Sequence, residues 1–182
     1  MDDLSAGGSR PWLAVGVEVA QTLETVDPDQ FAAVVEAFAN PGRRWFFTGQ
    51  GRSGLVARMA AMRVMHLDRT AHVLGEATAP SVRAGDGLVV LSGSGATPVS
   101  LGFATIARQE GARVLAITAQ GASPLAELAD TALVLRAGES AQLGGSLFEQ
   151  TSLLVLDALI FTLGAQMGDA HGSLARRHTN MQ

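Results

Sequence analysis

The chain of 182 residues contains no cysteine and no tyrosine, and because it also lacks lysine, all 13 of its basic residues are arginines. Without lysine, the chain cannot form a Schiff base with a carbonyl substrate, and it has no P-loop lysine. Without cysteine, it has no thiolate nucleophile, disulfide or cysteine-bound zinc. Any chemistry must therefore use serine, threonine, histidine, carboxylates and backbone groups.

Other absences narrow the choice of partner and location. No run of about 18 uncharged apolar residues is present, and Asp2 and Asp3 replace a basic signal region, so we expect no membrane span and a cytoplasmic protein. The net charge is −4 and the arginines are scattered, which argues against nucleic acid as a partner. The four histidines lack the i, i+4 spacing of paired metal ligands, so we predict no metal and no cofactor.

The length suits a single domain. We expect two helices within residues 1–40, a sheet with its helices within 41–170, and a C-terminal tail at 171–182. The break between the first two helices is predicted at Asp27 and Pro28, because aspartate is a favoured N-cap and proline suits the first helical position.

Short apolar segments alternate with helical segments along the rest of the chain. Strands are predicted at 45–47, 72–74, 87–91, 114–118 and 133–135, and helices at 55–65, 97–110, 124–129 and 146–168. Fully apolar strands are typical of a parallel sheet covered on both faces, and right-handed crossovers favour double winding. We therefore predict an α/β fold: a doubly wound five-stranded parallel sheet flanked by helices, in a flavodoxin-like three-layer sandwich.

The predicted helix from Ser146 is apolar on nearly every side, so it requires burial all round. The domain itself could bury it, or it could join the N-terminal helices in a subunit interface. The sequence leaves both open, and we expect a homo-oligomer.

A glycine-rich turn, Gly49 to Gly54, follows the first predicted strand. It matches the G-x-G-x-x-G fingerprint, and Glu76 lies at about the spacing of a ribose-binding acid. A dinucleotide-binding domain is therefore one alternative, although such an enzyme also needs a substrate domain, for which 182 residues leave no room. The other alternative is that the glycines serve only positive φ angles and tight packing.

The turn after the strand at 87–91 is rich in hydroxyl groups and has the sequence Ser92-Gly93-Ser94-Gly95-Ala96-Thr97. Pro98 follows at the first helical position, so Thr97 is the predicted N-cap. Three hydroxyls and free N–H groups at a helix N-terminus form a cradle for an anion. A turn that only caps the helix is the alternative, but capping needs one hydroxyl. With Ser53 from the first turn, the pattern predicts a site for a phosphate and a short polyol.

These turns resemble those of the SIS (sugar isomerase) family, whose phosphate loops carry an S-x-S-x-x-T turn. Within that family, several segments are similar, in the same order, to the 6-phospho-3-hexuloisomerases: 51–54, 62–67, 75–76, 92–95, 145–149 and 176–178. The resemblance covers nearly the whole chain. The sequence differs from the family's pattern at Gln50, at Ala96 and at 120–122. These differences affect the expected substrate specificity more than the expected reaction class.

The resemblance implies an isomerase that interconverts 3-hexulose 6-phosphate and fructose 6-phosphate in the ribulose monophosphate route of formaldehyde fixation. It also implies a homotetramer and suggests functional pairing with 3-hexulose-6-phosphate synthase. Another SIS sugar-phosphate isomerase and a non-catalytic sugar-phosphate sensor remain alternatives, although a sensor would not need a catalytic carboxylate.

Glu149 resembles the proton acceptor of the family. Ser146 and Glu149 also fit an S-x-x-E capping box, in which Glu149 would only bond to the backbone, and the sequence favours neither role. His178 is the second catalytic candidate, as an acid, proton shuttle or substrate clamp, and it could act in a neighbouring subunit or be a solvated tail residue. Further candidates for contact with the substrate are Gly51, Arg52 and Glu76.

Overall fold

The computed structural model describes residues 10–181, and its centre is a five-stranded parallel sheet. The strand order is β2-β1-β3-β4-β5, and every neighbouring pair is parallel. The strands are β1 (Trp45–Gly49), β2 (Ala71–Val73), β3 (Gly87–Leu91), β4 (Arg113–Thr118) and β5 (Thr131–Val134). The predicted five-stranded parallel sheet is therefore confirmed.

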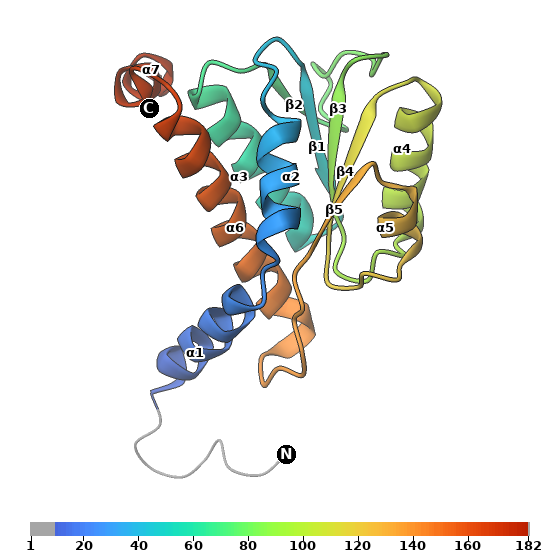
Figure 1. Cartoon of the computed structure of the whole chain (residues 1–182), viewed down its shortest axis with the longest axis vertical. Helices are drawn as coiled ribbons and strands as arrows, with labels where there is room; N and C mark the ends of the chain where they lie inside the picture. The colour runs from blue at the N-terminus through green and yellow to red at the C-terminus, as the bar shows by residue number, and fades with distance from the viewer. Residues whose placement is uncertain (1–9, 182) are drawn as a thin grey trace.

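Helices cover both faces of the sheet (Figure 1). One core cluster joins the sheet to helices α2 (Pro28–Ala37), α3 (Arg52–His66) and α6 (Ser146–Ala165). A second cluster joins the other face to α4 (Pro98–Gln109) and α5 (Pro124–Leu128). The fold is the predicted three-layer α/β sandwich.

Strand β1 shows why the strands are apolar at every position. Trp45 and Phe47 belong to the first cluster, whereas Phe46, between them, belongs to the second. Successive side chains of a strand point to opposite faces, so a strand covered on both faces has no solvent-facing position. Trp45 is fully buried and stacks on Phe38, with 3.8 Å between the ring centroids.

Helix α2 begins as predicted. Asp27 Oδ1 accepts hydrogen bonds from Asp29 N at 2.8 Å and from Gln30 N at 3.2 Å, and Pro28 is the first helical residue. The preceding helix, α1 (Pro11–Glu24), packs against α6 and extends away from the sheet (Figure 1).

Helix α6 is enclosed only on its inner side. It packs against α1, α2 and α3, but Phe161 is 80% exposed and Leu154 is 43% exposed. Burial within this chain therefore accounts for only part of its apolar surface. By length and composition alone, residues Leu143–Ala165 would suffice to cross a membrane, and 50% of their most apolar window is buried inside the fold.

The segment expected to be a tail contains a helix, α7 (Ala170–Arg177). Asp169 caps this helix through its side chain. Ser173 is buried, and its hydroxyl donates to the carbonyl of His66 at 3.0 Å. The C-terminal segment is therefore docked on the end of α3. The N-cap residue Asp169 is the sequence signal for this helix, and the prediction of a tail did not take it into account.

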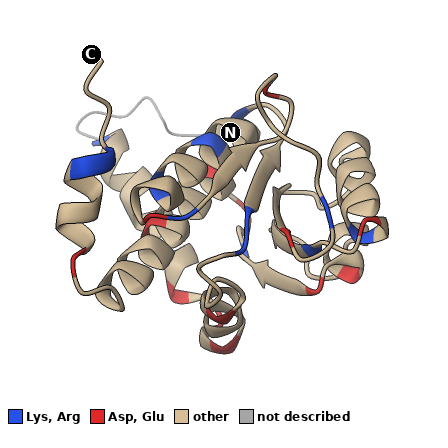
Figure 2. Ribbon diagram, turned by 90° about the horizontal axis from the view of Figure 1, so that it is seen from above, with Lys and Arg blue, Asp and Glu red and all other residues tan. Residues whose placement is uncertain are grey.

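Arginines and acids are interspersed over the described part of the molecule (Figure 2). Arg44 pairs with Asp86 at 2.6 Å, and Arg63 of α3 lies 3.7 Å from Asp157 of α6. Local pairing thus places positive charge beside negative charge at several points of the fold.

Candidate active site

Loops from neighbouring strands meet at the edge of the sheet where the strands end. In the strand register, Gly49 at the end of β1 pairs with Leu91 at the end of β3, and Leu91 pairs with Ile117 of β4. The loops that follow these strands therefore start at the same level. In doubly wound folds this edge is where ligands bind.

The hydroxyl-rich loop after β3 is held by bonds within it and to β4. Ser92 Oγ and Thr97 Oγ1 lie 3.1 Å apart, and Ser92 N donates to Ile117 O at 3.0 Å. Thr97 occupies the N-cap position of α4, as predicted, but its side chain makes no capping hydrogen bond. The interpretation of the loop as a capping turn is therefore wrong. The first N–H groups of α4, left without this cap, can bind an anion.

Two glycines let this loop approach its neighbours closely. Gly95 has a φ angle of +61°, and a Cβ there would collide with the side chain of Ser123. A Cβ at Gly93 would come within 3.2 Å of the ring of Phe148. Thr118 of β4 donates from Oγ1 to the carbonyl of Gly93 at 3.3 Å. Thr118 was not predicted, although a hydroxyl at the end of the neighbouring strand was an available signal.

The glycine turn after β1 is explained by backbone packing. Gly51 has a φ angle of +56°. A Cβ at Gly49 would lie 2.8 Å from the backbone of Ser53, and a Cβ at Gly54 would lie 2.6 Å from the carbonyl oxygen of Gly49. The G-x-G-x-x-G spacing is thus accounted for by the contact of β1 with α3, without a dinucleotide.

A pocket of about 450 Å³ opens beside the hydroxyl-rich loop. Its walls come from that loop, from the end of β4, from the loop between β5 and α6, and from the first turn of α6. The lining residues are Gly93, Ser94, Ala119, Ala137, Gly138, Ser140, Gln142, Gly144, Gly145, Leu147, Phe148 and Glu149. Three predicted site residues therefore line the same pocket: Gly93 and Ser94 for phosphate, and Glu149 for proton transfer.

The remaining predicted phosphate-binding residues, which are Ser53, Ser92, Gly95, Ala96 and Thr97, are not among those that line the pocket. Ser92 is buried, and so is Ser53 in the first turn of α3. Ala96 is exposed, and its N–H donates to Ser94 Oγ at 3.2 Å. Among the hydroxyl-bearing residues of the loop, Ser94 is thus the one that lines the pocket.

Glu149 is paired with an arginine from another helix. Arg52 Nε donates to Glu149 Oε2 at 2.8 Å, with the Glu149 side chain 18% exposed and that of Arg52 54% exposed. Arg52 also donates to the carbonyl of Gly144. Ser146 donates its hydroxyl back to the carbonyl of Leu143 at 2.8 Å and is the first residue of α6, so the capping box does not form. Glu149 is therefore free of the structural role that the local pattern suggested.

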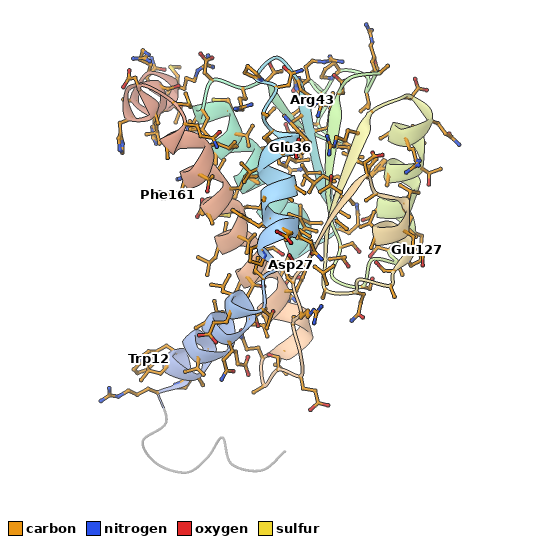
Figure 3. The ribbon with its side chains drawn as sticks, in the orientation of Figure 1. Trp12, Asp27, Glu36, Arg43, Glu127 and Phe161 are labelled. Atoms are coloured by element: carbon orange, nitrogen blue, oxygen red, sulfur yellow. The ribbon has the colours of Figure 1, made fainter. Side chains whose placement is uncertain are left out.

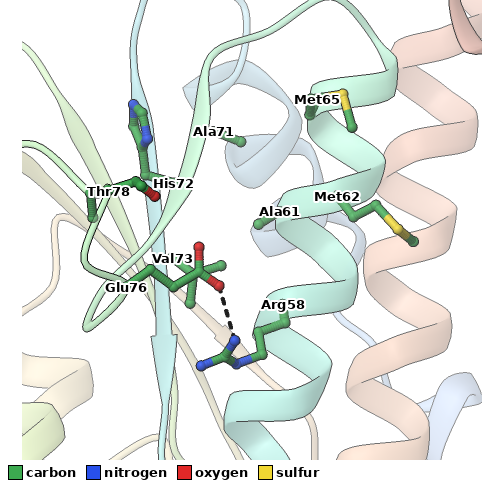
Figure 4. Close-up of a pocket in the computed structure, with 10 residues that line it drawn as sticks. Arg58, Ala61, Met62, Met65, Ala71, His72, Val73, Glu76 and Thr78 are labelled. Carbon is green, nitrogen blue, oxygen red and sulfur yellow. Dashed lines mark hydrogen bonds and ion pairs between the residues drawn. The ribbon is translucent and has the colours of Figure 1, made fainter. Parts of the chain in front are cut away.

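Glu76 lies in a different pocket, shown in Figure 4. It pairs with Arg58 of α3 at 2.9 Å, in a cavity of about 310 Å³ beside the edge strand β2. His72 and Thr78 line the same cavity. The structure therefore does not bring Glu76 together with Ser94 and Glu149.

His178 also lies far from Glu149. Its ring stacks on that of His66, with 5.8 Å between centroids, and His66 ends α3, the helix that begins at Arg52. Arg52, which pairs with Glu149, and His66 are separated by a helical rise of about 21 Å along α3. Burial, followed by the nearby His178 and Arg63, lowers the pKa of His66. Within residues 10–181, no group of three or more His, Asp or Glu side chains is placed to hold a metal ion.

The parallel sheet, the hydroxyl-rich loop and the carboxylate in one pocket are features of a sugar-phosphate site, and the sequence agrees. Residues 38–162 match the SIS domain family model, so the chain belongs to the SIS family. A 3-hexulose-6-phosphate isomerase from Mycobacterium gastri is 43% identical over 173 residues, which cover 91% of this chain and 86% of that protein. The enzyme of the same name from Methylomonas aminofaciens is 32% identical, with 90% of this chain and 92% of that protein covered.

A solved structure from Methanococcus jannaschii has the same fold. It superposes with a TM-score of 0.85 at 28% identity and covers 96% of this chain and 100% of that one. Its crystal structure was interpreted as that of a 3-hexulose-6-phosphate isomerase. The predicted fold and family are confirmed.

Proposed function

We propose that this chain is a 3-hexulose-6-phosphate isomerase, which interconverts 3-hexulose 6-phosphate and fructose 6-phosphate. The observation that carries the proposal is that Ser94 and Glu149 line one pocket on a fold shared with enzymes of that name. The loop supplies donors for the phosphate, and the carboxylate supplies a base for the sugar carbon.

The reaction moves a carbonyl group from C3 to C2 by proton transfer. The Glu149 carboxylate takes the proton from C2, the C2–H electron pair forms the C2=C3 bond, and the C3 carbonyl oxygen takes up a proton to give an enediol. The enediol then loses the proton on its C2 oxygen and receives one at C3. A single base can carry the carbon-bound proton between the adjacent carbons.

The phosphate binds at the start of α4. The Ser94 hydroxyl and the uncapped N–H groups there donate hydrogen bonds, and the positive end of the helix dipole adds attraction. Arg52 bridges Glu149 and the carbonyl of Gly144, so it is close enough to the pocket for an anionic substrate to compete for its guanidinium. Such competition would release the Glu149 carboxylate for catalysis.

The substrate needs no ring opening in the forward direction. With O6 phosphorylated, a 3-ketohexose lacks the hydroxyl that would close a five-membered hemiketal on C3, so it is already an open chain. Fructose 6-phosphate forms a ring and must open before the reverse reaction.

The protein acts as a homo-oligomer, which by family resemblance is a tetramer. Apolar side chains of α1 and α6 point outward from the sheet, among them Trp12, 69% exposed, and Phe161, 80% exposed (Figure 3). Large exposed apolar patches mark interaction sites. A second copy packed antiparallel against α6 about a twofold axis brings the far end of its own α6, with His178 beside it, toward Glu149.

His178 would then complete the site of the neighbouring subunit as a clamp or as a shuttle between the two oxygens. The cellular setting is the cytoplasm, in the ribulose monophosphate pathway, next to a 3-hexulose-6-phosphate synthase that supplies the substrate.

A coupled assay tests the activity. Purified protein receives enzymatically generated 3-hexulose 6-phosphate, and the formation of fructose 6-phosphate is followed for the wild type and for Ser94→Ala. Turnover by the wild type with a KM that rises in Ser94→Ala supports the proposal. If the wild type binds sugar phosphates but does not isomerise 3-hexulose 6-phosphate, the assignment to the SIS family stands and the proposed activity is wrong.

A further inference from the structure

The loop between β5 and α6 forms one wall of the candidate active site. Six of its residues line the pocket: Ala137, Gly138, Ser140, Gln142, Gly144 and Gly145. The loop leaves the sheet after Leu135, and it ends at Gly144 and Gly145, with φ angles of +64° and +81°. Its position must therefore be set by contacts with the elements beside it.

One carboxylate from α1 supplies such contacts. Glu18 Oε2 accepts hydrogen bonds from Ser140 Oγ at 2.7 Å and from Gln142 Nε2 at 3.0 Å, and Glu18 Oε1 accepts one from Ala141 N at 2.9 Å. Ser140 Oγ also accepts a bond from Gln142 N at 3.0 Å. The Glu18 carboxylate thus joins three consecutive residues of the loop into one network.

The network shows that Glu18 is more than a solvated surface acid. Hydrogen bonds from Ser140, Ala141 and Gln142 lower the pKa of Glu18, and hydrogen bonds to charged groups are stronger than those between neutral groups. A second anchor, from Arg52 to the carbonyl of Gly144, holds the other end of the same wall. Arg52 also holds Glu149, so the loop and the candidate base are fixed through connected contacts.

We infer that Glu18 is a positioning residue of the active site, which holds the loop at 137–145 in the shape that closes the sugar-phosphate pocket. This inference rests on the proposed function for its kinetic consequence, but its structural consequence can be measured without catalysis. Glu18 acts through Ser140 and Gln142, which both line the pocket.

Hydrogen exchange and kinetics of Glu18→Ala test the inference, with Glu24→Ala as the matched control, because Glu24 is an exposed acid on the same helix. In Glu18→Ala we expect amide exchange of peptides within 137–145 to quicken about tenfold, and KM for the sugar phosphate to rise by a similar factor, as for the loss of one or two charge-assisted hydrogen bonds. Glu24→Ala should match the wild type in both measurements.

Three outcomes would overturn the inference. Exchange in 137–145 could stay within twofold of the control, exchange could quicken equally throughout the chain, or KM could stay unchanged while the loop loosens. If Glu18→Ala fails to fold, Gln142→Ala removes one bond to Glu18 from the loop side and is expected to quicken exchange at 140–141. If the wild type shows no isomerase activity, the proposed function fails, and the exchange comparison still decides whether Glu18 holds the loop.

Discussion

Replacing Glu149 by glutamine separates catalysis from stability. In the structure, its described ionic contact is with Arg52, whose side chain is 54% exposed. Exposed ion pairs contribute about 0–1 kcal/mol, and because the Glu149 side chain is only 18% exposed we take the upper end, so the melting temperature should fall by no more than about 2–4 °C for a domain of this size. Loss of a general base costs about 10²–10⁴-fold in rate. We therefore expect kcat to fall at least about 100-fold in a protein that remains folded.

Asp157→Asn is the matched control, because Asp157 also lies on α6 and faces an arginine of α3, at 3.7 Å. It should change the melting temperature to a similar extent and leave kcat within about twofold. Both variants are assayed for fructose 6-phosphate formation, with circular dichroism melting curves recorded in parallel. If Glu149→Gln keeps more than about a tenth of the wild-type kcat, Glu149 is not the base.

Four further predictions concern the loop, the histidines and the exposed face. Gly95→Ala should destabilise the protein by roughly 1–3 kcal/mol in urea unfolding, because alanine is strained at positive φ and its Cβ meets a neighbouring side chain; an unchanged midpoint would refute this. Because folding lowers the pKa of His66, the unfolded chain binds more protons than the folded chain below about pH 6.5, and the free energy of unfolding falls as the pH falls. From pH 7.5 to 5.5, the wild type should therefore lose more stability than His66→Asn. Equal losses in the two proteins would contradict this prediction. Phe161→Glu should reduce the oligomer mass in light scattering, whereas an unchanged mass would remove this face from the interface. Mixing Glu149→Gln with His178→Ala should restore activity if sites are shared between subunits, and no recovery would place His178 outside the neighbour's site.

The sheet and the loop positions could be predicted from the sequence because both depend on local patterns. Apolar runs such as 45–47 and 87–91 mark strands that are buried on both faces. The residues that follow a parallel strand must lie at one edge of the sheet, so Ser94 could be assigned to the site without knowledge of the tertiary contacts.

The partner of Glu149 could not be predicted in this way. Arg52 is 97 positions away, and their contact depends on the packing of α3 against α6. The local S-x-x-E pattern pointed to a cap that does not form, because the chain enters α6 through a short 3₁₀ turn, Leu143–Gly145, and Ser146 bonds back to Leu143. The hydrogen bonds between Glu18 and Ser140, 122 positions apart, escaped prediction for the same reason.

The exposed side of α6 and the remote position of His178 share one geometric cause. The helix runs from Glu149 at one end to the region of α7 at the other, and its outer apolar residues, Leu154 and Phe161, lie between these ends. An antiparallel α6 from a second copy would cover these residues. It would also bring the end of that helix near its own His178 toward Glu149 of this chain. A sequence pattern describes one chain, so it could indicate that α6 needs further burial without identifying what covers it, and the proposed second copy would account for both the exposed face and the position of His178.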